Sequence, residues 1–111
     1  MDINDISTCE KFVMKVIWDS TEDLALQDIM GKVNEENEKS WKPQTVSTFL
    51  SRLVKKGFLS MYRKGRYCYY VPLIEQEEYC ESQIQRMATL FFGGDVQGLG
   101  KFVQGLLQDK N

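Results

Sequence analysis

The sequence predicts a mainly α-helical fold, in which three short helices precede an antiparallel β-hairpin and further helices follow it. Apolar residues recur at helical spacing in three successive segments before Gly57. Two aromatic-rich segments then flank a Lys-Gly pair, a pattern typical of a tight hairpin. Beyond residue 74, two more apolar stripes at helical spacing stand on either side of a Gly-Gly pair.

The first helix is expected to begin at a capping box, with Ser7 as the N-cap and Glu10 three residues later, and to run to about Asp19. After a polar connection, Leu24 and Ala25 are expected to form a short extended piece. A second helix follows and ends in the polar residues 34–40. Its apolar face consists of Leu26, Ile29, Met30 and Val33.

The third helix is expected between Pro43, which suits a first helical position, and Gly57, which suits the position just beyond a helix end. Two arcs divide this helix. The apolar arc consists of Val46, Phe49, Leu50, Leu53 and Val54. The polar arc consists of Gln44, Thr45, Ser47, Thr48, Ser51, Arg52, Lys55 and Lys56.

The polar arc has the composition of a helix that lies in a DNA major groove. Short hydroxyl and amide side chains reach base edges, and Arg and Lys neutralise phosphates. An ordinary surface helix is the alternative interpretation, but such helices usually mix Glu among the Lys to form i,i+4 pairs. This segment contains no Glu.

The charge distribution points to the same region. The formal net charge is −2, which by itself argues weakly against a nucleic-acid partner. Between Lys39 and Arg66, however, there are eight basic residues and no Asp or Glu, whereas the rest of the chain has six basic and sixteen acidic residues. A polyanion responds to the local field, so this segment predicts a nucleic-acid-binding surface. A solvated basic face is the weaker alternative.

The hairpin is expected to pair residues 58–63 with residues 66–71, with Lys64 and Gly65 in the turn. Gly65 supplies the positive φ that a two-residue turn requires. Three helices followed by a hairpin form a winged helix-turn-helix domain, which we expect to cover residues 1–73. The tip of the wing is expected to reach flanking phosphates or a minor groove through Arg63, Lys64 and Arg66.

Residues 74–111 are expected to form C-terminal dimerisation helices. The winged domain is complete without them, so pairing with a second copy is the economical way to cover their apolar stripes. Packing back onto their own domain is the alternative. The residues expected at the dimer contact are Tyr79, Ile84, Met87, Phe91, Leu99, Val103 and Leu106.

The sequence lacks residues that several kinds of catalytic and ligand-binding site require. There is no His, the commonest general base and metal ligand, and no phosphate-cradling glycine loop. We therefore expect no catalytic residue, no metal site and no cofactor. Neither a signal peptide nor a membrane span is expected, and the widely spaced Cys9, Cys68 and Cys80 fit free thiols in a cytoplasmic protein.

One series of residues between positions 6 and 72 forms a specific pattern: Ile6, Ser7, Glu10, Val13, Met14, Lys15, Val16, Ile17, Trp18, Trp41, Lys42, Pro43, Gln44, Thr45, Val46, Ser47, Thr48, Leu50, Arg52, Leu53, Val54, Lys55, Lys56, Gly57, Leu59, Gly65, Arg66, Tyr70 and Pro72. In this pattern, residues 6–72 resemble the penicillinase repressor family, the BlaI/MecI/CopY type. The tail is covered more loosely.

This resemblance implies a repressor that binds a palindromic operator in double-stranded DNA as a homodimer. Carried over by position, the residues that would face DNA from the third helix are Lys42, Gln44, Thr45, Ser47, Thr48, Arg52 and Lys55, with Arg66 and its neighbours in the wing. Gln44 stands where the family often has Lys. The resemblance also implies a sensor protease as a partner, but Lys101-Phe102, the only nearby candidate bond, matches poorly, and the cysteine-rich hook of the copper-responsive members is absent after Cys80.

A winged-helix module that binds another protein and does not bind DNA is the rival interpretation, because such modules share the same core. The acid-free, hydroxyl-rich face of the third helix favours DNA, since a protein-binding version is expected to carry apolar or mixed-charge residues there.

Overall fold

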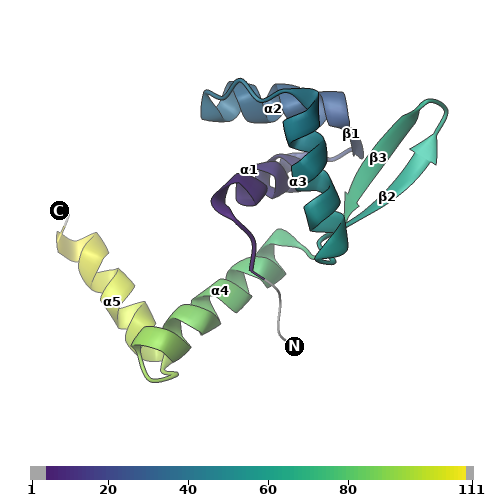
Figure 1. The fold of residues 1–111 in the computed structure, drawn as a ribbon. Coiled ribbons are helices and arrows are strands. Elements are labelled where there is room, and N and C mark those ends of the chain that lie inside the picture. Colours follow the sequence, from purple (N-terminus) through teal and green to yellow (C-terminus); the bar gives the residue numbers. More distant parts are fainter. Residues whose placement is uncertain (1–4, 110–111) are drawn as a thin grey trace. The chain divides into compact units, whose positions relative to one another are not determined.

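The computed structural model describes residues 5–109, which fall into two compact units that divide between residues 76 and 77, close to the expected boundary after residue 73. We call residues 5–76 the N-terminal unit and residues 77–109 the C-terminal unit. The elements in chain order are α1 (Thr8–Asp19), β1 (Leu24–Ala25), α2 (Leu26–Asn37), α3 (Pro43–Lys55), β2 (Leu59–Lys64), β3 (Tyr67–Pro72), α4 (Gln76–Phe91) and α5 (Val96–Asp109) (Figure 1).

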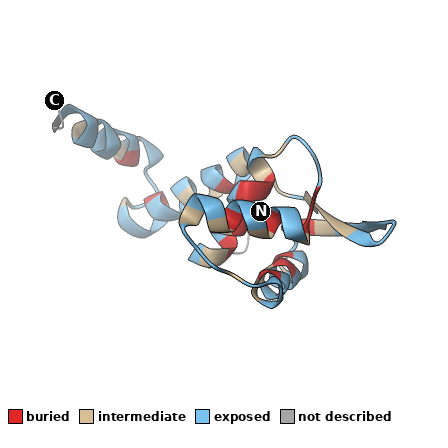
Figure 2. Cartoon of the chain, turned by 90° about the horizontal axis from the view of Figure 1, so that it is seen from above, coloured by how far each residue is buried: buried red, intermediate tan, exposed pale blue. Residues whose placement is uncertain are grey.

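The core of the N-terminal unit lies where α1, α2 and α3 meet (Figure 2). The helical spacing of apolar residues in each segment brings one face of every helix into this core. Its fully buried members include Val13, Met14, Ile29, Val33, Val46, Leu50, Leu53 and Phe58.

A small antiparallel sheet completes the N-terminal unit, with the strand order β1-β3-β2. β1 pairs with β3 through Leu24 opposite Tyr70 and Ala25 opposite Tyr69. Three helices, a short strand and a two-stranded wing in this order confirm the predicted winged helix-turn-helix fold.

The turn of the wing differs by one residue from the prediction. Lys64 belongs to β2 and pairs with Tyr67, so the turn consists of Gly65 and Arg66. Gly65 has a φ of +67°, and Arg66 is not among the residues with positive φ. A glycine in the first of two turn positions is the requirement of a type II′ turn, which places Gly65 there and moves Lys64 into the strand.

The predicted capping box starts α1. The Ser7 hydroxyl accepts a hydrogen bond from the Glu10 N–H at 3.1 Å, and the Glu10 carboxylate accepts one from the Ser7 N–H at 2.7 Å. Two N–H groups that the helix cannot satisfy internally are therefore paired. The Trp18 indole N–H donates to the Ile74 carbonyl at 2.8 Å, which ties the end of α1 to the segment after β3.

In the C-terminal unit, α4 and α5 are separated at Gly93 and Gly94, which have φ values of +59° and +85°. The Gly94 N–H donates to the Ala88 carbonyl at 2.9 Å and so helps to end α4. Ala88 and Leu99 are buried, and the rings of Phe92 and Phe102 lie 5.8 Å apart. Gly98, Gly100 and Gly105 do not prevent α5 from continuing to Asp109.

Within residues 5–109, no helix has the length and apolar character needed to cross a membrane. The same residues contain no cluster of side chains suited to a metal ion. Cys9, Cys68 and Cys80 are free thiols.

Candidate nucleic-acid interface

The start of α3 is fixed by a clamp on the preceding loop. The Asn34 side chain accepts a hydrogen bond from the Trp41 N–H at 2.9 Å and donates one to the Trp41 carbonyl at 3.0 Å. Both main-chain groups of Trp41 are thus held by one side chain on α2. Pro43 then occupies the first turn of α3, where its missing N–H costs no hydrogen bond.

The end of α3 is equally defined. The Phe58 N–H donates to the Leu53 carbonyl at 2.9 Å and the Gly57 N–H to the Val54 carbonyl at 3.1 Å. This is a Schellman motif, in which the residue after the helix takes a left-handed conformation, and Gly57 has a φ of +85°. Both ends of α3 are therefore set by hydrogen bonds, and the burial of Val46, Leu50 and Leu53 turns the polar arc outward.

The outer face of α3 carries most of the predicted DNA-contacting residues in exposed positions. Gln44, Thr48 and Lys55 share one side of the helix, because their positions are separated by whole helical turns. This side lies opposite the buried residues of the helix. The exposed predicted residues of this region are Lys42, Gln44, Ser47, Thr48, Arg52 and Lys55. We call these residues, together with Ser51, the α3 outer face.

Two residues of α3 require a change from the sequence interpretation. Val54, assigned to the apolar arc, is 38% exposed, because it lies at the margin of the arc whose centre is occupied by Val46 and Leu53. Ser51 belongs to the predicted polar arc, although it is not among the residues predicted to contact DNA. It is exposed, one turn from both Thr48 and Lys55, so helical spacing alone identifies it as part of the same face.

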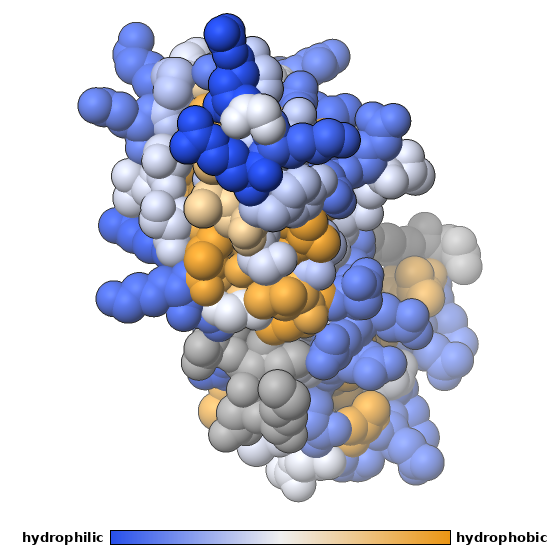
Figure 3. All heavy atoms as spheres, turned by 90° about the vertical axis from the view of Figure 1, so that its right-hand side faces the viewer, coloured by the Kyte–Doolittle hydropathy of each residue, from blue (hydrophilic) through white to orange (hydrophobic). Residues whose placement is uncertain are grey.

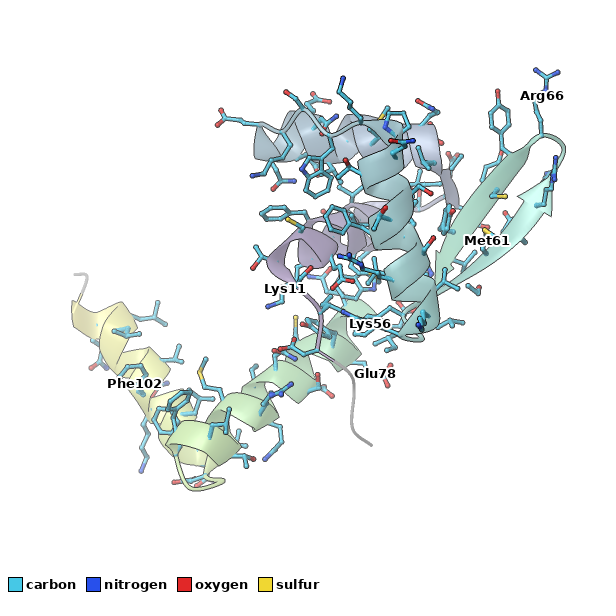
Figure 4. The ribbon with its side chains drawn as sticks, viewed as in Figure 1. Lys11, Lys56, Met61, Arg66, Glu78 and Phe102 are labelled. Carbon is cyan, nitrogen blue, oxygen red and sulfur yellow. The ribbon has the colours of Figure 1, made fainter. Side chains whose placement is uncertain are left out.

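Thr45 and Lys56 lie at the edge of this face. Thr45 is half-buried. The Lys56 ammonium donates to Glu10 Oε1 at 2.8 Å, and Glu10 is 1% exposed. Lys56 therefore joins the end of α3 to the start of α1, and its charge is already paired within the chain (Figure 4).

The hydroxyl of Thr48 has a defined role in the helix. It donates to the Gln44 carbonyl at 3.0 Å, four residues earlier. Because a hydroxyl has one proton, Thr48 presents to the outside an acceptor oxygen and a methyl group. Such a side chain accepts a hydrogen bond from an amino group on a base or contacts the methyl group of thymine.

An aromatic cluster borders the α3 outer face. The Trp41 ring lies 4.9 Å from the Phe49 ring and 6.4 Å from the Phe12 ring. The Arg52 guanidinium lies 6.0 Å from the centre of the Phe49 ring, and the Lys39 ammonium lies 5.8 Å from that of Phe12. Cations held over ring faces keep their charge at the surface, next to the helix.

The wing tip forms a second basic surface. Arg63, Lys64 and Arg66 are exposed, and Arg66 points away from the sheet at the tip (Figure 4). The Arg63 Nε donates to the Gly65 carbonyl across the turn at 3.2 Å. On the face of the molecule that the wing presents, strongly hydrophilic side chains stand above an apolar patch (Figure 3).

Electrostatically, the two surfaces share one sign. The chain has no Asp or Glu between Glu38 and Glu75, a range that includes all of α3 and both wing strands. A surface with short hydrogen-bonding groups at its centre and cations at its margins suits a polyanion that also offers polar base edges.

The predicted dimer residues divide into two groups. Tyr79 and Leu99 are 5% and 6% exposed, so one chain already covers them. The others remain exposed, and Phe91 is exposed the most, at 76%. Four further apolar residues are exposed but are not among the predicted dimer residues: Leu90, Val96, Phe102 and Leu107. Each lies one helical turn from a predicted dimer residue.

Comparison with known proteins identifies relatives of this chain. The penicillinase repressor family model matches residues 6–110. The penicillinase repressor of Bacillus licheniformis is 31% identical over 97 residues, which make up 87% of this chain and 73% of the relative. The methicillin resistance regulatory protein MecI of Staphylococcus aureus (strain N315) is 30% identical over 74 residues, or 67% of this chain and 58% of MecI.

A solved structure is also similar. The solution structure of the monomeric form of Bacillus licheniformis BlaI in complex with the blaP half-operator matches with a TM-score of 0.56 and 35% identity. The match covers 70% of this chain and 92% of that one. Since the family model covers nearly the whole chain and the first relative is more than 30% identical, the chain belongs to the penicillinase repressor family.

Proposed function

We propose that this protein is a sequence-specific DNA-binding transcriptional repressor that acts as a homodimer on a palindromic operator. The observation that carries the proposal is the α3 outer face, on which exposed hydroxyl and amide groups stand beside cations without any acidic residue. The BlaI relative, solved in complex with a half-operator, supports the same assignment.

The two basic surfaces have different roles in this proposal. On α3, the residues that read base edges in the major groove are Gln44, Thr45, Ser47 and Thr48, to which we add the neighbouring Ser51. Lys42, Arg52 and Lys55 bind phosphates. In the wing, Arg63, Lys64 and Arg66 bind the flanking backbone or a minor groove. We leave Lys56 out of this interface, because its pairing with the buried Glu10 would have to be broken first.

Homodimerisation is proposed for the C-terminal unit. Along α4, Ile84, Met87 and Phe91 are between 49% and 76% exposed, and along α5, Val103 and Leu106 are 46% and 49% exposed. A monomer that exposes several large apolar side chains gains free energy when a second copy covers them. A two-fold symmetric dimer would present two α3 helices, which fits a palindromic operator.

A sensor protease is a further proposed partner. The Lys101–Phe102 bond lies inside α5, with Phe102 against Phe92. Cleavage there would require α5 to unwind locally, because proteolytic nicking is favoured in exposed, irregular segments. The site of action proposed for the repressor is the cytoplasm, where its three thiols would stay reduced.

Selection from a random pool of duplexes tests the proposal. Fragments retained by the full chain at moderate ionic strength are expected to share a consensus with two-fold symmetry. Retention without a consensus would contradict sequence-specific repression, and a consensus without symmetry would contradict the homodimer on a palindrome. Retention of no duplex would favour a module that binds protein.

A further inference from the structure

The basic part of the wing extends beyond the support of its neighbouring strand. β1 pairs only with Tyr69 and Tyr70 of β3. The pairs Arg63–Cys68 and Lys64–Tyr67 lie further out, where β2 and β3 have only each other (Figure 1). All three cations of the wing, Arg63, Lys64 and Arg66, belong to this outer part. A two-stranded ribbon is marginally stable and twists easily, so its direction depends on how its base is held.

Tyr62 belongs to the outermost β2–β3 pair that still has β1 beside it. It pairs with Tyr69, which also pairs with Ala25 of β1. The Tyr62 ring stacks on the Tyr69 ring with centres 5.5 Å apart. Its hydroxyl donates to Asp23 Oδ2 at 2.6 Å, so the side chain reaches from the outer strand, past the middle strand, to the residue before β1.

Asp23 is itself held by an ordered loop. The Ser20 hydroxyl donates to the Glu22 carbonyl at 2.7 Å and accepts from the Glu22 N–H at 3.1 Å. The hydrogen bond to the Asp23 carboxylate raises the pKa of Tyr62, so its hydroxyl stays protonated and remains a donor. A charge-assisted hydrogen bond of this kind is stronger than one between neutral groups.

We propose that Tyr62 and Asp23 are positioning residues for the wing: their hydrogen bond, together with the Tyr62–Tyr69 stack, sets the direction in which Arg63, Lys64 and Arg66 project toward DNA. This inference rests on the proposed DNA-binding function. Neither residue contacts DNA in this account. Both act through the wing cations.

A double-mutant cycle tests the inference on the full chain, with a duplex that the wild type has selected from a random pool. Tyr62→Phe removes the hydroxyl and keeps the ring stack. Its affinity is expected to fall by about twofold to tenfold, the range that a net hydrogen-bond free energy allows. Because Tyr62 acts only through the wing cations, Tyr62→Phe should add little to the loss already caused by replacing Arg63, Lys64 and Arg66 together with Ala. The losses of affinity caused by Tyr62→Phe and by Arg52→Ala should instead multiply, because Arg52 lies on α3 and not in the wing.

Controls separate positioning from folding. Asp23→Ala should reproduce the loss of Tyr62→Phe, and the two together should cost no more than either alone. Tyr70→Phe removes a hydroxyl from the neighbouring strand on the opposite face of the sheet, so it should bind like the wild type. Thermal unfolding of each variant shows whether the N-terminal unit is intact, and Asp23→Asn, which keeps an acceptor, should recover part of the affinity.

The outcomes are distinguishable. If the wild type binds and Tyr62→Phe binds equally well, or if its loss multiplies with that of the variant lacking all three wing cations, the positioning role is wrong while the repressor proposal stands. If the wild type retains no duplex at all, the proposed function fails and this inference fails with it.

Discussion

Glu10 shows how one residue joins two elements. It completes the capping box of α1 and also accepts a hydrogen bond from Lys56 at the end of α3, although it is 1% exposed. Burial raises the pKa of its carboxyl, but hydrogen bonds from Lys56 and Ser7 outweigh burial and bring the pKa below its usual 4.5. The charged form of Glu10 therefore stabilises the fold that holds α3 in place.

Replacing this carboxyl tests that role. Glu10→Gln keeps the shape but removes the charge, so the free energy of unfolding at neutral pH is expected to fall by about 1–3 kcal/mol, as for hydrogen bonds to charged groups. Urea unfolding measures the difference. Asp19→Asn, which disrupts the exposed Lys15–Asp19 pair, should change it by less than about 1 kcal/mol.

The difference in stability between wild type and Glu10→Gln should also depend on pH. Since the folded-state pKa of Glu10 is lowered, its contribution is complete above the unfolded-state value of 4.5 and is lost as the pH falls through the folded-state value. The stability difference between wild type and Glu10→Gln should therefore shrink in acid. A difference that grows below pH 4.5 would contradict this assignment.

Asn34 is a second residue whose replacement should lower the stability of the fold through identified hydrogen bonds. Asn34→Ala removes both hydrogen bonds to the main chain of Trp41 and is expected to lower the free energy of unfolding by about 1–3 kcal/mol. Asn34→Asp keeps the acceptor for the Trp41 N–H but sets a carboxylate oxygen against the Trp41 carbonyl oxygen, so it should be destabilising as well. An unchanged free energy of unfolding for both variants in urea would show that the clamp does not act through these two bonds.

Among the elements, α3 was the most predictable from the sequence. Its apolar residues recur at helical spacing, Pro43 and Gly57 mark its ends, and the structure places it at Pro43–Lys55. The position of Val54 was not predictable, because a margin residue is covered or exposed according to what packs beside it. Nor was the pairing of Lys56 with Glu10, which depends on residues that are 46 positions apart.

The wing shows the same limit. Gly65 indicated the turn, but the choice of Lys64 or Arg66 as its companion depends on the turn type, and the one-residue shift follows from a type II′ geometry. The Tyr62–Asp23 hydrogen bond joins segments that the sequence separates, so no local pattern could have predicted it.

Thr48 gives the sharpest test of base reading by α3. Thr48→Ser removes the methyl group and Thr48→Val removes the hydroxyl, so the two changes separate a contact with a thymine methyl from a hydrogen bond to a base. For a true base contact, one of them should lower discrimination at a single operator position by about 1–3 kcal/mol. Competition band shifts measure this, and unchanged preference in both variants would remove Thr48 from the base-reading set.

For the whole molecule, the sequence predicted helices after the wing, whereas it could not say which of their apolar residues one chain would cover. Tyr79 and Leu99 are buried already, and Leu90 and Leu107, outside the predicted set, are exposed. Helical spacing identifies a stripe, but burial within the stripe is decided by packing between helices that the pattern does not describe.

The proposed homodimer is tested by replacing Phe91, the most exposed of the predicted dimer residues. Phe91→Glu places a charge where the proposed interface is apolar and should weaken association by about 3–6 kcal/mol for the two copies, since each loses the burial of a phenyl ring. Sedimentation should give twice 12.9 kDa for the wild type and 12.9 kDa for the variant. Lys101→Glu, an exposed polar change on α5, should leave the dimer intact, and a monomeric wild type at micromolar concentration would refute the assembly.

The proposed repressor function depends above all on contact between the α3 outer face and duplex DNA. The measurement is the salt dependence of duplex binding by wild type and Arg52→Ala, followed by fluorescence anisotropy. The wild type is expected to bind tightly at low ionic strength. The slope of log affinity against log salt should be about 1 unit shallower in the variant, because one phosphate contact is lost. Absence of binding by the wild type at low ionic strength, or identical slopes for the two proteins, would contradict the proposed function.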